Sequence, residues 1–401
     1  MEADGFARLE FGVPAWGGLD FNHMASPGTA PISVTLEPST GSGATQALLT
    51  AMLRAGDRVS DLIFSPGRPP QIEVLGELIP VTAPGLRALS TDDTRRIASD
   101  LIGNNKQAIT SLREQGSCDV SYGLPGLARF RVNVFIQRGS CAVVMRAIPT
   151  TIPSFADLGL PAHMAEIAGL NEGIVLVAGP RGSGKSSTLA ALLDCINEKQ
   201  NCHILTIEDP IEFLHNHKRS TVHQREMHSD ASNFAQALRS ALRQAPKVIM
   251  VGELRDRETM EMVLEAAETG HLVLSSMNSP DISKTVERLA SAFAPAEQAA
   301  VRNRLAKTLR WVVAQRLIPR KGGNGRLAAF EILKVNARAM QCLETYDHSG
   351  QALLTIIKEG HMDGMQHFDG EISRLIESGA VDMDVALRHA TNPEEVRKTR
   401  N

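Results

Sequence analysis

The sequence predicts an α/β protein built from two domains, and three observations lead to that prediction. A glycine-rich turn, GPRGSGKS at 179–186, follows a short apolar run and precedes a stretch of helix formers. From about residue 165 to about residue 335, strand-like and helix-like segments alternate, which is the pattern of a parallel sheet covered on both faces. Ahead of them, a proline-bearing segment at 148–161 separates this part from an N-terminal part with its own strands and helices.

Composition and periodicity divide the chain further. Residues 1–44 are rich in Gly, Pro, Ser and Thr and show no periodicity, so we expect a flexible extension there. A first domain then covers 45–150, a linker 151–165, a second domain 166–370, and C-terminal helices with a tail 371–401. An apolar stripe at helical spacing predicts a helix that ends at Gly379; the stripe consists of Met365, Phe368, Ile372, Leu375 and Ile376.

The first domain shows both helical and strand patterns. Apolar residues at helical spacing after residue 45 predict a first helix, which Gly56 closes. The segment STDDTRRIASDLI, 90–102, begins with a serine that has an aspartate three residues on, so we expect a capped helix. Alternation in RFRVNVFI, 129–136, predicts a strand with Phe130 on one face and Arg131 on the other. A second strand, CAVVMRAI, carries Arg146.

Composition argues against several classes of function. The 401 residues carry a formal net charge of −3 and 4% aromatic residues, which is unlike a nucleic-acid-binding protein with basic grooves and stacking platforms. The five cysteines form no Cys-x-x-Cys pair, so we expect neither a zinc site nor a redox site. No apolar stretch approaches the about 18–20 residues of a membrane-spanning helix, and the N-terminus lacks the pattern of a secretory signal. We therefore expect a cytoplasmic protein with no nucleic-acid partner.

The segment 179–186, here called the phosphate-binding loop, fits the pattern G-x-x-x-x-G-K-[ST] at every fixed position. Its glycines let backbone N–H groups turn towards phosphate oxygens, and the helix that follows presents its unpaired N–H groups to the same anion. We expect Lys185 to reach the β and γ phosphates of ATP, and Ser186 to ligate Mg²⁺. The predicted nucleotide-binding residues are Gly179, Pro180, Arg181, Gly182, Ser183, Gly184, Lys185, Ser186 and Ser187.

Two acidic segments follow this loop. TIEDPIEF places Glu208 after the apolar strand HILTI, and VIMVGELRD places Glu253 just past the apolar run 248–251. A carboxylate at a buried strand end beside such a loop is well placed to orient an attacking water molecule. Arg131 and Arg146 are candidates to neutralise charge on the γ-phosphate, because the arginine fork matches phosphate geometry. A solvated strand face is the ordinary alternative for both arginines.

Four stretches resemble the motifs of the secretion ATPase superfamily, in the same order. The phosphate-binding loop is similar to its Walker A motif, TIEDPIEF to its Asp box, VIMVGELRD to its Walker B motif, and AAETGHLVLSSMNSPD to its His box. Within the superfamily, the chain resembles the PilT/PilU branch of type IV pilus retraction ATPases over roughly residues 45–395. Further similar stretches are LPGLARFRVN, QREMHSD and GMQHFD. The resemblance implies a PAS-like α+β domain, then a RecA-like P-loop ATPase domain with a helical C-terminal part.

The resemblance also implies an assembly and roles for residues. It implies a homo-hexamer with ATP near the domain junction, with Glu253 as the catalytic glutamate and Glu208 as the acid near Mg²⁺. Arg131 and Arg146 match the first-domain arginines that reach nucleotide. The family acts at the cytoplasmic face of the inner membrane on a polytopic platform protein, where hydrolysis drives pilus retraction and twitching motility. Many assembly and type II secretion relatives carry a tetracysteine zinc motif, which this sequence lacks.

Several positions depart from the family pattern. Asn278 stands where the His box usually has a histidine; asparagine can donate a hydrogen bond to phosphate but carries no proton or charge. Ala245-Pro246-Lys247 replaces a frequent Asp-Pro-Asp, and DLIF at 61–64 lacks a common histidine. The retraction ATPases' C-terminal motif is not recognisable in ARAMQCLETYD, and LRQAPKVIM and LRDRETME are more similar to PilU, the accessory paralogue.

Three functions therefore stay open. The first is a hexameric ATPase that powers retraction. The second is an accessory or weakly active ring subunit that regulates a paralogous retraction ATPase. The third is a pilus assembly or secretion ATPase.

Overall fold

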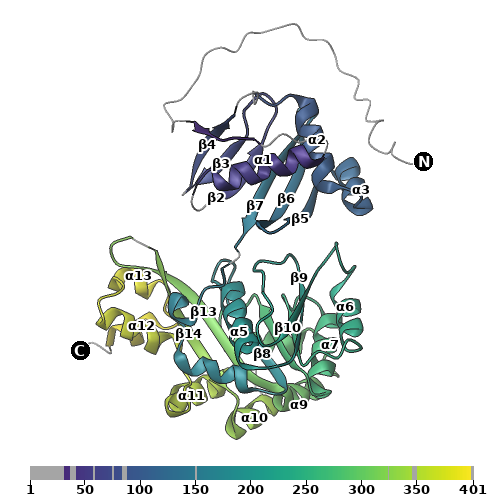
Figure 1. Cartoon of the computed structure of the whole chain (residues 1–401). Coiled ribbons are helices and arrows are strands. Elements are labelled where there is room, and N and C mark those ends of the chain that lie inside the picture. The colour runs from purple at the N-terminus through teal and green to yellow at the C-terminus, as the bar shows by residue number, and fades with distance from the viewer. Residues whose placement is uncertain are drawn as a thin grey trace. The chain divides into compact units, whose positions relative to one another are not determined.

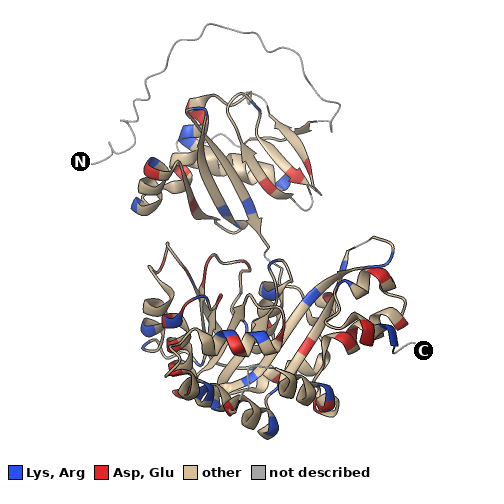
Figure 2. Ribbon diagram, turned by 180° about the vertical axis from the view of Figure 1, so that it is seen from behind, with Lys and Arg blue, Asp and Glu red and all other residues tan. Residues whose placement is uncertain are grey.

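The computed structural model describes residues 31–36, 42–56, 59–74, 76–83, 88–149, 151–323, 325–345 and 350–398. Most of the predicted N-terminal extension lies outside these residues. The chain divides into two compact units, Met1–Pro149 and Thr150–Asn401, and each contains one sheet with its own helices (Figure 1). Acidic and basic residues are interspersed along the ribbon in the described parts of both units (Figure 2).

The first unit is built on a seven-stranded sheet that is antiparallel except at one edge. In spatial order its strands are β1 (Ile32–Ser33), β4 (Glu77–Thr82), β3 (Gln71–Val74), β2 (Val59–Phe64), β7 (Ser140–Ile148), β6 (Ala128–Gln137) and β5 (Ser117–Leu124). Its helices are α1 (Ser42–Arg54), α2 (Thr91–Ile102) and α3 (Lys106–Gln115). The predicted capping box of α2 is confirmed, because the side chains of Ser90 and Asp93 each accept a hydrogen bond from the other residue's N–H.

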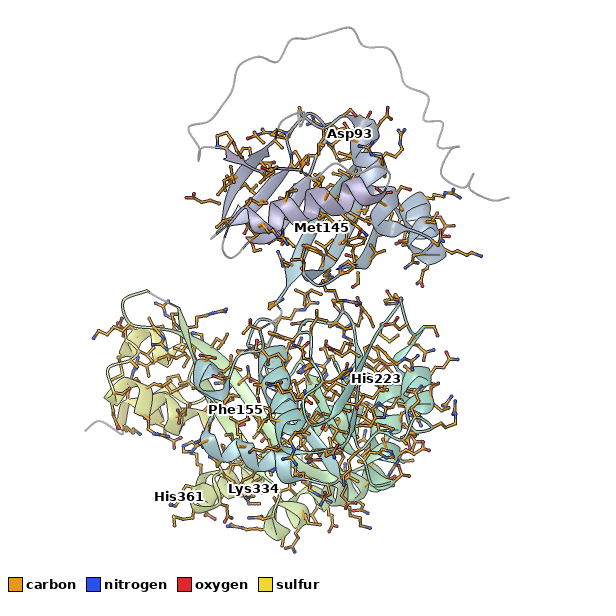
Figure 3. The ribbon with its side chains drawn as sticks, viewed as in Figure 1. Asp93, Met145, Phe155, His223, Lys334 and His361 are labelled. Carbon is orange, nitrogen blue, oxygen red and sulfur yellow. The ribbon has the colours of Figure 1, made fainter. Side chains whose placement is uncertain are left out.

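The helices of the first unit share one hydrophobic core with one face of its sheet. Phe130 of β6 is fully buried there with Met52 of α1. Met145 of β7 lies in the same core, between the sheet and the helices (Figure 3). The predicted alternation is confirmed, since Arg131 and Arg146 lie on the opposite face of these strands and are exposed.

The second unit contains a seven-stranded sheet that is parallel except for its last strand. In spatial order the strands are β10 (Thr221–Glu226), β9 (His203–Glu208), β11 (Val248–Val251), β12 (Leu272–Met277), β8 (Gly173–Ala178), β13 (Leu309–Pro319) and β14 (Arg326–Lys334). Every residue of β8, β11 and β12 is buried, as expected for parallel strands that are covered on both faces.

Alternate residues of β8 point into two separate cores. Val175 and Val177 lie in the core of α5 (Lys185–Lys199) and the 3₁₀ helix η1 (Ala162–Gly169). Ile174 and Leu176 lie in the other core, which the remaining helices cover. Those helices include α6 (Phe234–Ala241), α7 (Arg257–Glu268), α8 (Ile282–Ser291) and α9 (Gln298–Thr308).

The C-terminal helices extend this second core beside β13 and β14 (Figure 1). They are α10 (Ala337–Glu344), α11 (Gln351–Glu359), the short 3₁₀ helix η2 (Gly360–Asp363), α12 (Phe368–Glu377), α13 (Met383–Leu387) and α14 (Pro393–Lys398). The predicted apolar stripe is confirmed in and just before α12, after which Gly379 has a left-handed φ of 70°. None of the helices in the described ranges is long and apolar enough to cross a bilayer.

The predicted α/β class is confirmed: an α+β unit precedes a parallel phosphate-loop sheet with a helical C-terminal part. Regular structure is present in the predicted linker and continues across the predicted boundary at residue 370. Residues 151–165 contain α4 (Phe155–Leu158) and the start of η1, and Leu160 and Met164 are buried in the core that contains α5. α12 runs across residue 370 without a break.

Candidate active site

The phosphate-binding loop connects β8 to α5, as the sequence predicts. Gly184 is the N-cap of α5 and has a left-handed φ of 89°, a conformation that strains any residue with a side chain. A Cβ on Gly179 would overlap the hydroxyl of Ser183. The backbone therefore requires glycine at both positions. The turn that they permit leaves the first N–H groups of α5 available to an anion.

Two polar groups of the loop are placed to meet a ligand. Lys185 Nζ donates to the carbonyls of Gly179 and Pro180 at 2.9 and 3.0 Å. Burial lowers the pKa of Lys185, and the charge of Glu253 is the largest influence in the opposite direction. Ser183 is 3% exposed, and its Oγ has no hydrogen-bond partner among the described residues. A buried hydroxyl without a partner is unfavourable, so a phosphate oxygen would satisfy it.

The other predicted loop residues lie on either side of these groups. Arg181 is exposed in the turn, next to Gly182. Ser186 and Ser187 lie in the first turn of α5. The loop and the first turn thus form one contiguous cradle with the chemistry of a phosphate site.

Glu208 is the last residue of β9 and is buried. Its carboxylate accepts hydrogen bonds from Thr206 Oγ1 at 2.6 Å and from Gln224 Nε2 at 3.0 Å. Burial raises the pKa of Glu208 to about 7, because desolvation disfavours the charged form, and the hydrogen bonds only partly offset this effect. A cation placed nearby would favour the charged carboxylate.

Glu253 follows β11 at the same edge of the sheet. β9 and β11 are parallel neighbours, and a Cβ on Gly252 would lie only 3.6 Å from Glu208 Cα. Arg255 Nε donates to Glu253 Oε2 at 2.8 Å, and Arg255 Nη1 lies 3.7 Å from Asp209 Oδ2. The arginine therefore links the loops that follow the two strands.

Asn278 directly follows β12. Its carbonyl accepts a hydrogen bond from Arg288 Nη1 at 2.7 Å. The preceding residues tie three strand ends together: the Gly179 N–H donates to the Met277 carbonyl at 3.2 Å, and Ser276 Oγ donates to the Gly252 carbonyl at 2.6 Å. The phosphate-binding loop, Glu208, Glu253 and Asn278 thus all lie at the carboxyl edge of one parallel sheet, where α/β proteins bind their ligands.

Arg131 and Arg146 belong to the first unit, where they face each other across β6 and β7. Arg146 Nε donates to the buried Asp61 Oδ1 at 3.0 Å, and Arg131 Nε lies 4.0 Å from Asp119 Oδ1. Each arginine thus has a carboxylate of its own unit nearby, while its side chain stays more than half exposed. That these arginines serve the same nucleotide as the second unit stays a prediction.

Comparison with known proteins agrees with this geometry. Residues 117–378 match the family model described as Type II/IV secretion system protein. The chain belongs to this family. It is 41% identical over 335 residues to the type IV pilus retraction ATPase PilT of Pseudomonas aeruginosa, which covers 84% of this chain and 95% of that protein. It is 39% identical over 327 residues to a twitching motility protein of Neisseria gonorrhoeae, with 82% and 86% covered.

Other members of this secretion family refine the comparison. Identity to the type IV pilus ATPase PilU of P. aeruginosa is 35% over 352 residues, covering 88% of this chain and 90% of PilU. Identity over the aligned residues is therefore higher to PilT than to PilU. The crystal structure of the pilus retraction motor PilT with bound ADP matches with a TM-score of 0.77 at 35% identity, covering 88% of this chain and 98% of PilT. The resemblance to the retraction branch of the secretion ATPases is confirmed.

Two glutamines that were not identified from the sequence, Gln224 and Gln315, form hydrogen bonds with residues of the site. Gln224 of β10 holds Glu208, but it gave no signal because it lies in a polar strand. Gln315 of β13 is 2% exposed, and its amide bonds the Ser183 carbonyl and the Thr188 hydroxyl. Its signal was available: a glutamine stands inside the apolar run WVVAQRLI, and a buried amide needs partners.

Proposed function

We propose that this chain is a P-loop ATP hydrolase that powers type IV pilus retraction and thereby twitching motility. The single observation that carries the proposal is the meeting of a phosphate-binding loop with two strand-end carboxylates, Glu208 and Glu253, at one edge of a parallel sheet. The buried hydroxyl of Ser183, to which no described residue forms a hydrogen bond, supports a phosphate ligand there. The names of relatives that are 39% and 41% identical to this chain support the cellular role.

The positions of the residues support a division of labour. Lys185 exchanges its two loop carbonyls for the β and γ phosphates of ATP, and Ser186 and Glu208 would hold Mg²⁺. Magnesium usually takes one or two protein ligands besides phosphate oxygens and, when bound, neutralises charge on those oxygens. Glu253 orients the attacking water and accepts its proton. Asn278 donates a hydrogen bond to phosphate.

The first unit has a part in this proposal as well. Arg131 and Arg146 would neutralise negative charge on the γ-phosphate, and the chain would act as a homo-hexameric ring. We place the ring at the cytoplasmic face of the inner membrane, with the pilus platform protein as its partner. The interspersed charges of both units support the exclusion of nucleic acid as a partner (Figure 2).

The test is ATP turnover by the purified protein. Glu253→Gln is expected to lower the rate of hydrolysis by at least about 100-fold, because it removes the proton acceptor, while ATP binding persists. Glu265→Gln, at an exposed position of α7, is the matched control and should match the wild type. Equal rates for wild type and Glu253→Gln would overturn the assignment. Deletion of the gene decides the direction of work: excess pili without twitching mean retraction, and bald cells mean assembly.

A second candidate function is a ring subunit that binds ATP, turns it over weakly and regulates a paralogous retraction ATPase. Asn278 favours it, because this position carries no titratable group. The discriminating measurement is hydrolysis by the isolated protein, with and without the paralogue. Rapid turnover by the isolated protein would rule out the accessory role.

A further inference from the structure

We propose that Gln315 is a positioning residue that holds the phosphate-binding loop in its nucleotide-binding conformation. This inference rests on the proposed function, because it concerns the same site. In this proposal Gln315 makes no direct contact with the phosphate. It acts through the loop groups that it bonds, the Ser183 carbonyl and the Thr188 hydroxyl.

The sheet places Gln315 beside the start of the loop. β13 pairs with β8 in parallel, with Ala314 opposite Ala178, so Gln315 lies next to Gly179. The loop packs closely on this residue: a Cβ on Gly179 would lie 2.7 Å from the Gln315 carbonyl oxygen. A Cβ on Gly184 would lie 3.0 Å from Gln315 Nε2. Both required glycines of the loop therefore face one residue of β13.

The amide of Gln315 brackets the segment that supplies the phosphate ligands. Its Nε2 donates to the carbonyl of Ser183, and its Oε1 accepts a hydrogen bond from Thr188 Oγ1 at 2.8 Å. Ser183 precedes and Thr188 follows the segment 184–187, which contains Lys185 and Ser186. Gln315, Ser183 and Thr188 are each no more than 3% exposed, so water does not compete for these bonds.

This bracketing has a consequence for affinity. A glycine-rich loop samples many conformations when nothing holds it, and binding must then order it at a cost in free energy. Loss of the amide would also leave a buried carbonyl and a buried hydroxyl unsatisfied, which drives the loop towards other conformations. The fold thus orders the loop in advance through a residue over 100 positions away in the chain.

The test compares two buried amides that differ in location. Gln315→Met keeps the side-chain length but removes both hydrogen-bonding groups. Asn197→Leu is the matched control: Asn197 is fully buried in the last turn of α5, where it donates to the Asn216 carbonyl at 2.8 Å and accepts from the Lys218 N–H at 3.2 Å. The measurement is equilibrium binding of ADP with Mg²⁺ to the full chain, together with the melting temperature of each variant.

The proposal predicts different outcomes for the two variants. Both should lower the melting temperature, but only Gln315→Met should weaken ADP binding, by about ten-fold or more. Binding by Asn197→Leu should stay within about two-fold of the wild type. Unchanged binding by Gln315→Met, or equal weakening in both variants, would overturn the positioning role. A wild type that fails to bind nucleotide would instead overturn the proposed function itself.

A second pair of variants decides the matter if Gln315→Met does not fold. Thr188→Val removes the hydroxyl that bonds Gln315 Oε1, whereas Thr188→Ser retains it. We expect weaker ADP binding for Thr188→Val, by about three-fold to ten-fold, and near-wild-type binding for Thr188→Ser. Identical affinity in these two variants would overturn the proposal.

Discussion

Two regions of the second unit each hold a buried glutamate with the same titration behaviour. Glu208 ends β9 at the carboxyl edge of the sheet, and Glu331 lies in β14 beside the C-terminal helices. Burial raises the pKa of each to about 7. Glu208 ends a strand beside β11, which Glu253 follows, whereas Glu331 lies within β14, opposite Ala314 of β13. A perturbed pKa therefore does not by itself mark a catalytic group, and the surrounding geometry must decide.

The surroundings of the two glutamates differ in kind. Glu208 lies at the same sheet edge as a phosphate-binding loop whose buried Ser183 hydroxyl has no hydrogen-bond partner in the described parts of the chain, so this region has room in its bonding for a ligand. Glu331 instead accepts a hydrogen bond from the Ile282 N–H at 2.9 Å and faces the charges of Asp281 and Arg316. Arg316 donates to the His389 carbonyl at 2.6 Å, and its guanidinium lies 3.8 Å from the centre of the Phe368 ring. The polar groups around Glu331 are therefore bonded to one another and to neighbouring side chains of the same protein.

The largest expected difference is in activity. Glu208→Gln should lower the rate of ATP hydrolysis about 100-fold, because the amide cannot supply negative charge beside bound Mg²⁺. Glu331→Gln should leave the rate within about two-fold, because its surroundings are structural. The measurement is steady-state hydrolysis at saturating ATP and pH 7.5. Equal losses in the two variants would show that the two regions do not differ in this way.

Removal of Arg316 should have the next largest effect, and on stability. Arg316→Met loses hydrogen bonds to the carbonyls of His389 and Pro280 and its contact with the Phe368 ring. It also leaves Glu331 without its facing cation, so we expect a loss of about 2–4 kcal/mol in free energy of unfolding. Urea denaturation measures the change. Arg326→Met, at an exposed position of β14, is the control and should cost under about 0.5 kcal/mol.

The pH dependence of stability tests the raised pKa that Glu208 and Glu331 have in common. Each has a pKa raised from 4.5 to about 7, so between these pH values the folded chain keeps protons that the unfolded chain has lost. Stability must therefore fall as pH rises through this window, by about 2 kcal/mol per glutamate between pH 5 and pH 7.5. Glutamine does not titrate, so Glu208→Gln and Glu331→Gln should gain on the wild type as pH increases.

Melting temperatures without nucleotide, from pH 5 to pH 8, check this expectation. A gain that shrinks with rising pH would contradict the sign of both pKa shifts. Addition of Mg²⁺ and ADP should reduce the gain of Glu208→Gln only, because only that glutamate lies near the proposed metal site.

The sequence predicts the parts of this comparison that depend on local pattern. Glycines at 179 and 184 dictate the loop, and short apolar runs followed by an acid place Glu208 and Glu253 at strand ends. The partners of the loop were not predictable in the same way. Gln315 bonds Thr188 across 127 positions of sequence, and only the parallel pairing of β8 with β13 brings them together. Glu331 likewise has partners far from it in the sequence, the Ile282 N–H of α8 and the backbone of Phe368 of α12.

The smallest expected effect on stability comes from Asp281, which both caps a helix and places a negative charge near Glu331. Asp281 caps α8 by accepting from the Lys284 N–H at 2.7 Å, and its charge also faces Glu331. Asp281→Ala should cost about 1 kcal/mol in free energy of unfolding, whereas Asp281→Asn keeps a capping oxygen and should cost a few tenths. Because Asp281 helps to raise the pKa of Glu331, Asp281→Asn should also weaken the fall of stability with rising pH. An unchanged pH slope in Asp281→Asn would show that the charge of Asp281 does not contribute to the raised pKa of Glu331.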